Sequence, residues 1–189
     1  FYSNSWEIII NESGTFWLSE KPDTPASKSW DSSLPRIVTW AKFRNKISNN
    51  FVYVYNTHFD HLGQQAREQS SKIIIEHISK REHDAPVILL GDFNAAENNK
   101  AIAILKKGMP EGLSFFDPWN QMHPEETQRG TFNYWKSEKD GPKIDYIFAL
   151  KGTRVLDAQI LRRTFEGRNS SDHYPVTAKL VLTASLGDY

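Results

Sequence analysis

Ionisable and amide side chains are concentrated in four short strings, each of which adjoins an apolar run. These strings are NTHFDH at 56–61, GDFN at 91–94, KIDYIF at 143–148 and SDHYP at 171–175. Loops held by rigid strands are where catalytic and binding sites are usually assembled. Any one string has an ordinary explanation, because a lone Asp commonly stabilises a turn. The four together indicate a functional site.

The oxygen-bearing side chains in these strings have the chemistry of a divalent-cation site. Asp92, Asn94 and Asp172 offer carboxylate and amide oxygens, the hard ligands that Mg²⁺ or Mn²⁺ prefers. The chain has no cysteine, which excludes both disulfides and thiolate ligands for zinc. We therefore expect Mg²⁺ or Mn²⁺ as the cofactor, bound by these three residues.

Two histidines add proton-transfer and phosphate-binding chemistry. Asp145 lies inside an apolar run, where an unpaired carboxylate is costly, so it needs a partner, and His173 is the obvious candidate. Such a pair fixes the imidazole tautomer and raises its basicity. His58 can donate a hydrogen bond to a phosphate oxygen as charge builds in the transition state. These groups and the metal describe attack of water on a phosphate ester, with a catalytic set of His58, Asp92, Asn94, Asp145 and His173.

Apolar and alternating runs predict the strands that must position these residues. A Ser-Gly turn predicts a hairpin between the first two strands. The expected strands are 6–10, 15–18, 36–43, 51–58, 86–94, 143–150 and 173–182. If the two strands that precede NTHFDH and GDFN run opposite to the last two, all four strings meet at one edge of a sheet.

Helical periodicity is found in two segments. Apolar residues recur at i, i+3, i+4 spacing over 64–81, and a shorter amphipathic segment covers 101–107. Strands that outnumber helices in this way indicate an α+β or α/β fold with mixed sheets.

Composition limits the classes of function. A chain of 189 residues has the length of a single domain. Lys plus Arg and Asp plus Glu number 23 each, so the formal net charge is zero. That balance disfavours a protein that coats a polyanion, although it permits a local basic groove. No apolar stretch reaches about 18 residues, so we expect no membrane span. The sequence leaves localisation open between cytoplasm and periplasm.

Three of the strings form a specific signature in their order along the chain. GDFN, the later IDYIF and SDHYPV resemble the motifs of the endonuclease/exonuclease/phosphatase superfamily. That superfamily includes pancreatic-type deoxyribonucleases, apurinic endonucleases, deadenylases, sphingomyelinases and inositol-polyphosphate 5-phosphatases. The segment from GTFWLSEKPDTPASKSWD to LPRIVTW is similar to an uncharacterised bacterial branch of the same superfamily.

This resemblance implies a role for each candidate. Asp92 would orient or deprotonate the attacking water, and Asn94 would hydrogen-bond the phosphate. Asp172 would bind metal, whereas His173, held by Asp145, would contact the scissile phosphate and assist proton transfer.

The resemblance also implies a fold, a four-layer α/β sandwich of two mixed β-sheets flanked by helices. The site lies at one rim of that sandwich, where His58 matches the family's phosphate-contacting histidine. The family begins with a strand carrying an Asn and an element carrying a metal-binding Glu, and Phe1 aligns beyond both. We therefore expect residues 1–189 to be one domain of this type without its N-terminal strands, and inactive or very weak alone.

Four side chains near the strings are candidates for substrate binding. Arg67 lies early in the first predicted helix, where it either reaches a phosphate or braces the preceding loop. Asn133, Tyr134 and Trp135 lie in a loop near the site, where an exposed aromatic would stack on a base or a sugar, or else pack at the rim. The ester is undecided between nucleic acid, a small phosphate and a lipid, and no obligate protein partner is evident.

Two other functions fit parts of the sequence. NTHFDH is a broken form of the H-x-H-x-D-H zinc motif of metallo-β-lactamase-type hydrolases, with Asn56 where the first His belongs. The second alternative is a non-catalytic protein that keeps the fold and only binds a ligand. For any ester, the segments 21–35 and 108–142 are the candidate specificity loops.

Overall fold

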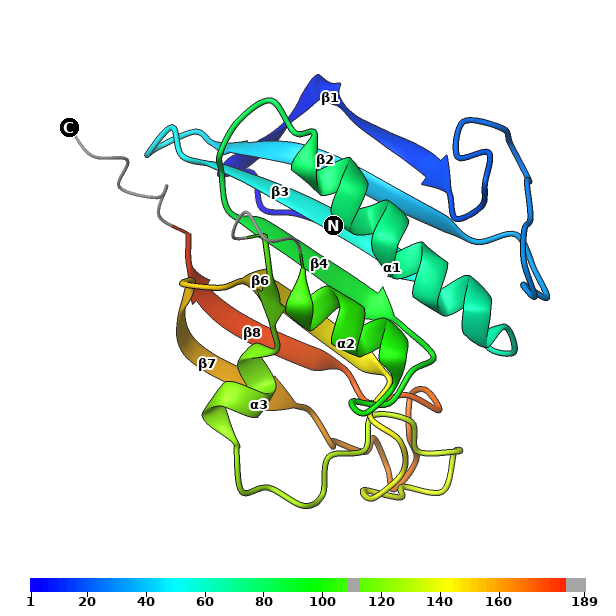
Figure 1. The fold of residues 1–189 in the computed structure, drawn as a ribbon. Coiled ribbons are helices and arrows are strands. Elements are labelled where there is room, and N and C mark those ends of the chain that lie inside the picture. The colour runs from blue at the N-terminus through cyan, green and yellow to red at the C-terminus, as the bar shows by residue number, and fades with distance from the viewer. Residues whose placement is uncertain (109–112, 183–189) are drawn as a thin grey trace.

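Two β-sheets with helices packed against them make up the fold (Figure 1). The computed structural model describes residues 1–108 and 113–182. The strands are Trp6–Trp17 (β1), Ile37–Asn45 (β2), Phe51–His58 (β3), Val87–Asp92 (β4), Phe115–Phe116 (β5), Asp145–Leu150 (β6), Arg154–Ile160 (β7) and Val176–Val181 (β8). The helices are Gln64–Ser79 (α1), Lys100–Lys107 (α2) and Pro118–Met122 (α3).

The larger sheet is mixed and has the strand order β1-β2-β3-β4-β6-β5. β3 and β4 run parallel and are connected through α1, whereas the other neighbouring pairs of this sheet are antiparallel. β7 and β8 form a separate antiparallel pair. Because β3 and β4 end where β6 begins, the ends of three adjacent strands lie at the same edge of the sheet.

Alternation of side chains along the central strands divides the apolar core into two faces. Tyr53 of β3 and Leu89 of β4 pack on the face that α1 and α2 cover (Figure 1). Val52 and Ile88 belong to a second cluster on the opposite face, which Leu180 of β8 joins. The chain therefore has the expected α/β sandwich, in which β7 and β8 provide the described part of the second sheet.

The predicted hairpin near the start of the chain is wrong, because residues 6–17 form one strand. β1 pairs with β2 from Trp6 opposite Asn45 to Trp17 opposite Ile37, with an irregularity between Ile8 and Ser13. The Ser-Gly pair stays extended because β2 supplies a long partner, and the bulge absorbs the extra residues.

Three elements were not expected from the sequence, namely β5, β7 and α3. For α3 a signal was present, since Asp117 accepts a hydrogen bond from the backbone N–H of Trp119 and Pro118 occupies the first turn. Among the described helices, none combines the length and apolar character needed to cross a bilayer.

Candidate active site

Three polar residues lie side by side where the central strands end. In the sheet register His58 of β3 is opposite Asp92 of β4, and Asp92 is opposite Asp145 of β6. His58 Nε2 lies 3.3 Å from Asp92 Oδ2. Strand alternation directs all three away from the face covered by α1 and α2. The parallel β3–β4 pair and antiparallel β6 thus bring three of the four strings to one edge.

His173 completes this group from the loop that precedes β8. Its Nδ1 lies 2.8 Å from Asp145 Oδ2, and the ligand atoms of Asp92, Asp145 and His173 all lie within 4.8 Å of one another. A carboxylate can only accept, so Nδ1 carries the proton and Nε2 is left for other partners. The hydrogen bond to Asp145 raises the pKa of His173, although burial opposes it.

Thr131, a residue that sequence reasoning missed, holds the strand of Asp145 against the loop of His173. Its hydroxyl accepts hydrogen bonds from the backbone N–H groups of Ile144 and Asp145, at 3.0 and 3.1 Å. Its carbonyl accepts from the N–H of Tyr174 at 2.7 Å. The position of the His173–Asp145 pair therefore depends on this buried threonine.

Asp92 is held in an environment that disfavours its ionised form. Burial raises the pKa of Asp92, the N–H bond from Asn94 opposes that effect, and the charge of Asp145 adds to it. The Asn94 N–H donates to Asp92 Oδ1 at 2.8 Å, and its side-chain Nδ2 donates to the carbonyl of Phe59 at 3.0 Å. Asn94 is thereby fixed beside Asp92 with a left-handed backbone, φ 45°.

His58 is partly exposed and adjoins both Asp92 and a cationic neighbour. Burial lowers the pKa of His58, Asp92 opposes that effect, and the charges of Arg36 and His173 add to it. A neutral imidazole retains one N–H donor and can offer it to a phosphate oxygen.

The donor set fits a hard divalent cation. Two carboxylates on adjacent strands repel each other, and a cation between or beside them relieves that repulsion. Asp172 is not a member of the close group formed by Asp92, Asp145 and His173 among the described residues. Its carboxylate instead lies 3.3 Å from the hydroxyl of Ser171. The ligand set of Asp92, Asn94 and Asp172 stays a prediction.

Asp60 is a second residue whose importance was missed, and it organises the wall beside His58. Both of its buried oxygens accept hydrogen bonds from the loops at 33–34 and 62–63. Burial acts to raise the pKa of Asp60, but these bonds outweigh it and hold the pKa well below its usual value. The loop that contains residues 33–34 also supplies Asp31, whose carboxylate accepts hydrogen bonds from the N–H groups of Gln65 and Ala66 at the start of α1.

The four predicted substrate-binding residues divide into two kinds. Arg67 is buried and donates to the carbonyl of Asp60 at 2.9 Å, so its contacts are those of the bracing alternative. Asn133 is also buried, and its amide is bonded within the protein, which places it behind the surface. Tyr134 and Trp135 are 45% and 63% exposed. Of the four, only these two are exposed at the surface.

The zinc alternative conflicts with the geometry of NTHFDH. In that motif Asp60 and His61 would be metal ligands next to His58. Asp60 is instead bonded to backbone N–H groups, and His61 Nδ1 lies 3.2 Å from Arg36 Nη2. Neither belongs to a group of candidate metal ligands within the described part of the chain.

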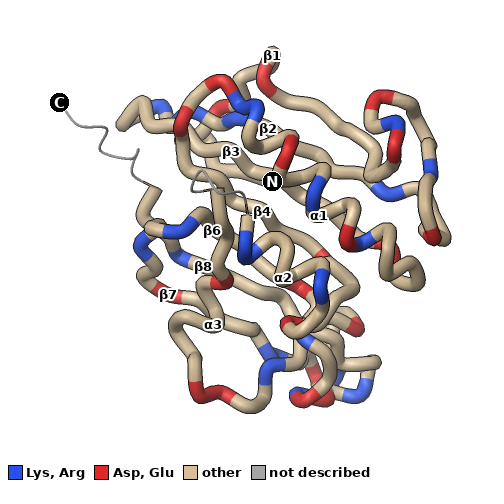
Figure 2. Tube along the Cα trace, in the orientation of Figure 1, with Lys and Arg blue, Asp and Glu red and all other residues tan. Residues whose placement is uncertain are grey.

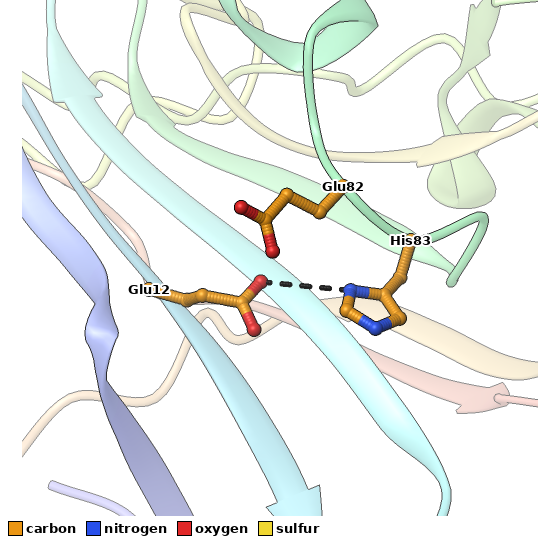
Figure 3. Close-up of side chains that lie close together, drawn as sticks. All are labelled: Glu12, Glu82 and His83. Carbon is orange, nitrogen blue, oxygen red and sulfur yellow. Dashed lines mark ion pairs between the residues drawn. The ribbon is translucent and has the colours of Figure 1, made fainter.

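A second cluster of ionisable residues lies near the far end of the larger sheet. Figure 3 shows Glu12 of β1 facing Glu82 and His83, which follow α1. The buried ammonium of Lys42 donates to Glu12 Oε1 and contacts His83 Nδ1, both at 2.7 Å. The ammonium of Lys42 therefore already supplies the positive charge that a metal ion would bring, and we assign this cluster a structural role.

Comparison with known proteins identifies the family of the chain. The profile described as "Endonuclease/Exonuclease/phosphatase family" matches residues 14–173. The mannosyl-6-phosphatase Bt3783 of Bacteroides thetaiotaomicron is 31% identical, with a TM-score of 0.82 over 96% of this chain and 69% of that one. An endonuclease/exonuclease/phosphatase from Bacteroides vulgatus is also 31% identical, with a TM-score of 0.84 over 97% and 69%.

More distant matches extend the comparison. The human nocturnin catalytic domain shares the fold, with a TM-score of 0.71 at 15% identity over 97% of this chain and 62% of that one. Protein L388 of Acanthamoeba polyphaga mimivirus is 33% identical over 95 residues, which are 48% of this chain. The matched part is about a third of the viral protein, 35% of its length.

Proposed function

Because the chain belongs to the endonuclease/exonuclease/phosphatase family, we propose that it hydrolyses a phosphate ester by metal-assisted attack of water. One observation carries this proposal, namely the group of Asp92, Asp145 and His173 within 4.8 Å at the ends of adjacent strands. Family members are phosphoesterase hydrolases, and a cation-binding carboxylate next to a carboxylate-held histidine supplies part of what that reaction requires.

The cation is assigned to Asp92 with Asn94 and Asp172, because Asp145 is already committed to His173. Mg²⁺ or Mn²⁺ bound there would polarise the phosphate and lower the pKa of a water molecule. Asp92 would also orient the attacking water.

The two histidines act on the phosphate from either side of Asp92. His173, with its proton held on Nδ1 by Asp145, contacts the scissile phosphate and passes protons through Nε2. His58 donates a hydrogen bond to a phosphate oxygen as negative charge develops. The role of His58 depends on the register that sets it opposite Asp92, and the role of His173 depends on the register that sets Asp145 opposite Asp92.

For the ester, we favour the monoester of a sugar over nucleic acid. The similarity to a mannosyl-6-phosphatase over 96% of this chain supports that choice. Charge supports it as well, since the net charge is zero and Lys and Arg are interspersed with Asp and Glu around the loops near the site (Figure 2). A nucleic-acid enzyme needs a run of positive charge along the phosphate backbone.

The test is a substrate panel assayed with Mg²⁺ and again after EDTA. It comprises mannose 6-phosphate, bis-p-nitrophenyl phosphate, inositol phosphates, sphingomyelin, single-stranded DNA, RNA and abasic duplex. In a protein that carries the family's N-terminal strands as well, we expect release of inorganic phosphate from mannose 6-phosphate, abolished by EDTA, whereas residues 1–189 alone should release much less. Fastest turnover of a nucleic acid would overturn the choice of ester.

Variants test the assignment of the site. Asp92→Asn and His173→Ala should each lower kcat by about a hundredfold or more, because each removes a group that acts in the transition state. Asp157→Asn, an exposed aspartate on β7, is the matched control and should retain kcat within about twofold. If neither site variant lowers turnover, the chain is a binding protein of the same fold and the catalytic proposal is wrong.

A further inference from the structure

The loop that follows Thr131 is anchored to the loop that carries His173. The N–H of Asn133 donates to the carbonyl of Asp172 at 2.7 Å, and its Nδ2 donates to the carbonyl of Ser171 at 3.1 Å. Asn133 Oδ1 accepts from the N–H of Trp135 at 2.8 Å. A fully buried amide therefore holds the start of this loop beside the candidate active site.

This anchoring maintains an unfavourable backbone at two bulky residues. Tyr134 and Trp135 have φ values of 54° and 63°, in the left-handed region that aromatic residues seldom adopt. Both residues nonetheless remain 45% and 63% exposed. Strained residues that remain exposed are commonly held for a functional reason.

A row of rings connects this pair to the site. The His173 imidazole is 4.9 Å from the Phe132 ring, and the Phe132 ring is 4.2 Å from the Tyr134 ring, measured between centroids. Tyr134 is therefore two ring contacts from the histidine that we assign to the scissile phosphate. A group esterified to that phosphate would lie within reach of the Tyr134–Trp135 surface.

The chemistry of the surrounding loop favours an uncharged ring. The next charged residues alternate in sign and cancel, so they offer no path for a polyanion: Lys136, Glu138, Lys139 and Asp140. An aromatic face carries partial negative charge and attracts the C–H groups of a saturated ring. A pyranose presents such C–H groups on its faces while its hydroxyls remain in water.

From this geometry we propose that Tyr134 and Trp135 form a platform that binds the sugar ring of a hexose phosphate and determines substrate specificity. The proposal rests on the function proposed above, and it adds the residues that recognise the leaving group. Asn133 acts as a positioning residue for the platform, through its bond to the Trp135 N–H.

The experiment compares an ester with a sugar ring with one that has none. For Tyr134→Ala, Trp135→Ala and the double variant, KM and kcat are measured on mannose 6-phosphate, glycerol 3-phosphate and adenosine monophosphate. We expect KM for mannose 6-phosphate to rise about tenfold in the double variant, with kcat and the glycerol 3-phosphate kinetics within about twofold. Trp135→Phe and Tyr134→Phe should restore most of the affinity.

The control is Tyr2→Ala, which removes an exposed tyrosine that packs on Phe43 at the opposite end of the larger sheet. It should leave all three KM values unchanged. If the double variant raises KM equally for mannose 6-phosphate and glycerol 3-phosphate, or for neither, the proposed platform is wrong. If KM rises for adenosine monophosphate and not for mannose 6-phosphate, the platform binds a nucleobase and the proposed sugar specificity is wrong.

Binding separates failure of the platform from failure of the proposed function. Saturation-transfer NMR on mannose 6-phosphate requires no turnover. Saturation of the ring protons in the wild-type chain, lost in the double variant, supports the platform even if no phosphate is released. Equal saturation in both proteins contradicts it.

Discussion

The hydrogen bond between Asp145 and His173 determines which nitrogen of the imidazole is free for chemistry. At 2.8 Å it joins a carboxylate on β6 to a ring on the loop before β8. Thr131 supports this arrangement by binding the backbone N–H of Asp145. The tautomer of His173 thus depends on Asp145 and, through it, on Thr131, which both lie far from His173 in the sequence.

Replacing Asp145 by Asn should remove control of the tautomer, because an amide can accept from Nδ1–H or donate to Nδ1. We expect kcat to fall by about a hundredfold or more with a smaller change in KM. Nitrogen NMR of the His173 ring should show loss of the Nδ1–H form that dominates in the wild-type chain. His123, which lies against the carbonyl of Ala158, is the internal reference. An unchanged tautomer with unchanged kcat would contradict the assignment.

At the scale of elements, the site depends on how closely the ends of β3 and β4 approach. Gly91 precedes Asp92 and has φ 141°, and a Cβ built there would lie 1.9 Å from the carbonyl oxygen of Thr57. Only glycine permits this approach. The position of Asp92 opposite His58 therefore requires a residue without a side chain before it.

Gly91→Ala should destabilise the protein by well over 3 kcal/mol, since the new atom overlaps backbone of the adjacent strand. Gly152→Ala is the matched control, because Gly152 also has a positive φ, 98°, but has no atoms within 4 Å of the added Cβ. It should cost only about 1–2 kcal/mol of backbone strain. Urea denaturation of both variants measures the difference, and similar losses would show that the close approach is unimportant.

The loop wall held by Asp60 gives a prediction for pH. The folded-state pKa of Asp60 is depressed, so its stabilising effect is present above the unfolded value of about 3.9 and is lost as pH falls below it. Asp60→Asn should lower the free energy of unfolding by about 3 kcal/mol at pH 7, because backbone donors lose a buried charged acceptor.

Denaturation as a function of pH tests the sign of this effect. The difference in the free energy of unfolding between wild type and Asp60→Asn should shrink as pH falls from about 5 toward about 2. The loss begins near the unfolded-state pKa of Asp60 and continues toward its depressed folded-state pKa. Asp157→Asn, at an exposed position, should show no such dependence. A difference that is the same at all pH values would contradict the role of Asp60.

At the scale of the whole molecule, the site is assembled from distant segments. Its residues come from β3, β4, β6 and the loop before β8, which only the completed sandwich brings together. Ligand binding to such a site stabilises the folded state as a whole. That residues 1–189 comprise a single domain of the family stays a prediction.

Cation binding should therefore raise the thermal stability of the chain. With Mn²⁺ at about a hundred times its Kd, the expected gain is about 2.7 kcal/mol, or about 5–10 °C in Tm for a chain of this size. The shift should be absent in Asp92→Asn and should disappear from the wild type when EDTA is added. A shift of the same size in Asp92→Asn would show that the cation binds elsewhere.

Much of the fold and the candidate site could be predicted from local sequence. The strand at 51–58 and the helix starting at residue 64 are found as predicted, because their apolar periodicity is long and regular. The pairing of Asp145 with His173 was expected because a carboxylate inside an apolar strand needs a partner. The hairpin failed, since a local turn signal competed with pairing to β2 along its whole length.

By itself, the sequence determined the family, the chemistry of the four strings and the strands that carry them. These depend on residue type and short-range spacing, which a chain displays without folding. Only the tertiary structure decided that Asp60 and Thr131 hold the site, that Arg67 and Asn133 are buried braces, and that Tyr134 and Trp135 remain exposed. Those assignments depend on which distant hydrogen-bonding groups meet, because burial and the partner of a polar side chain are properties of packing.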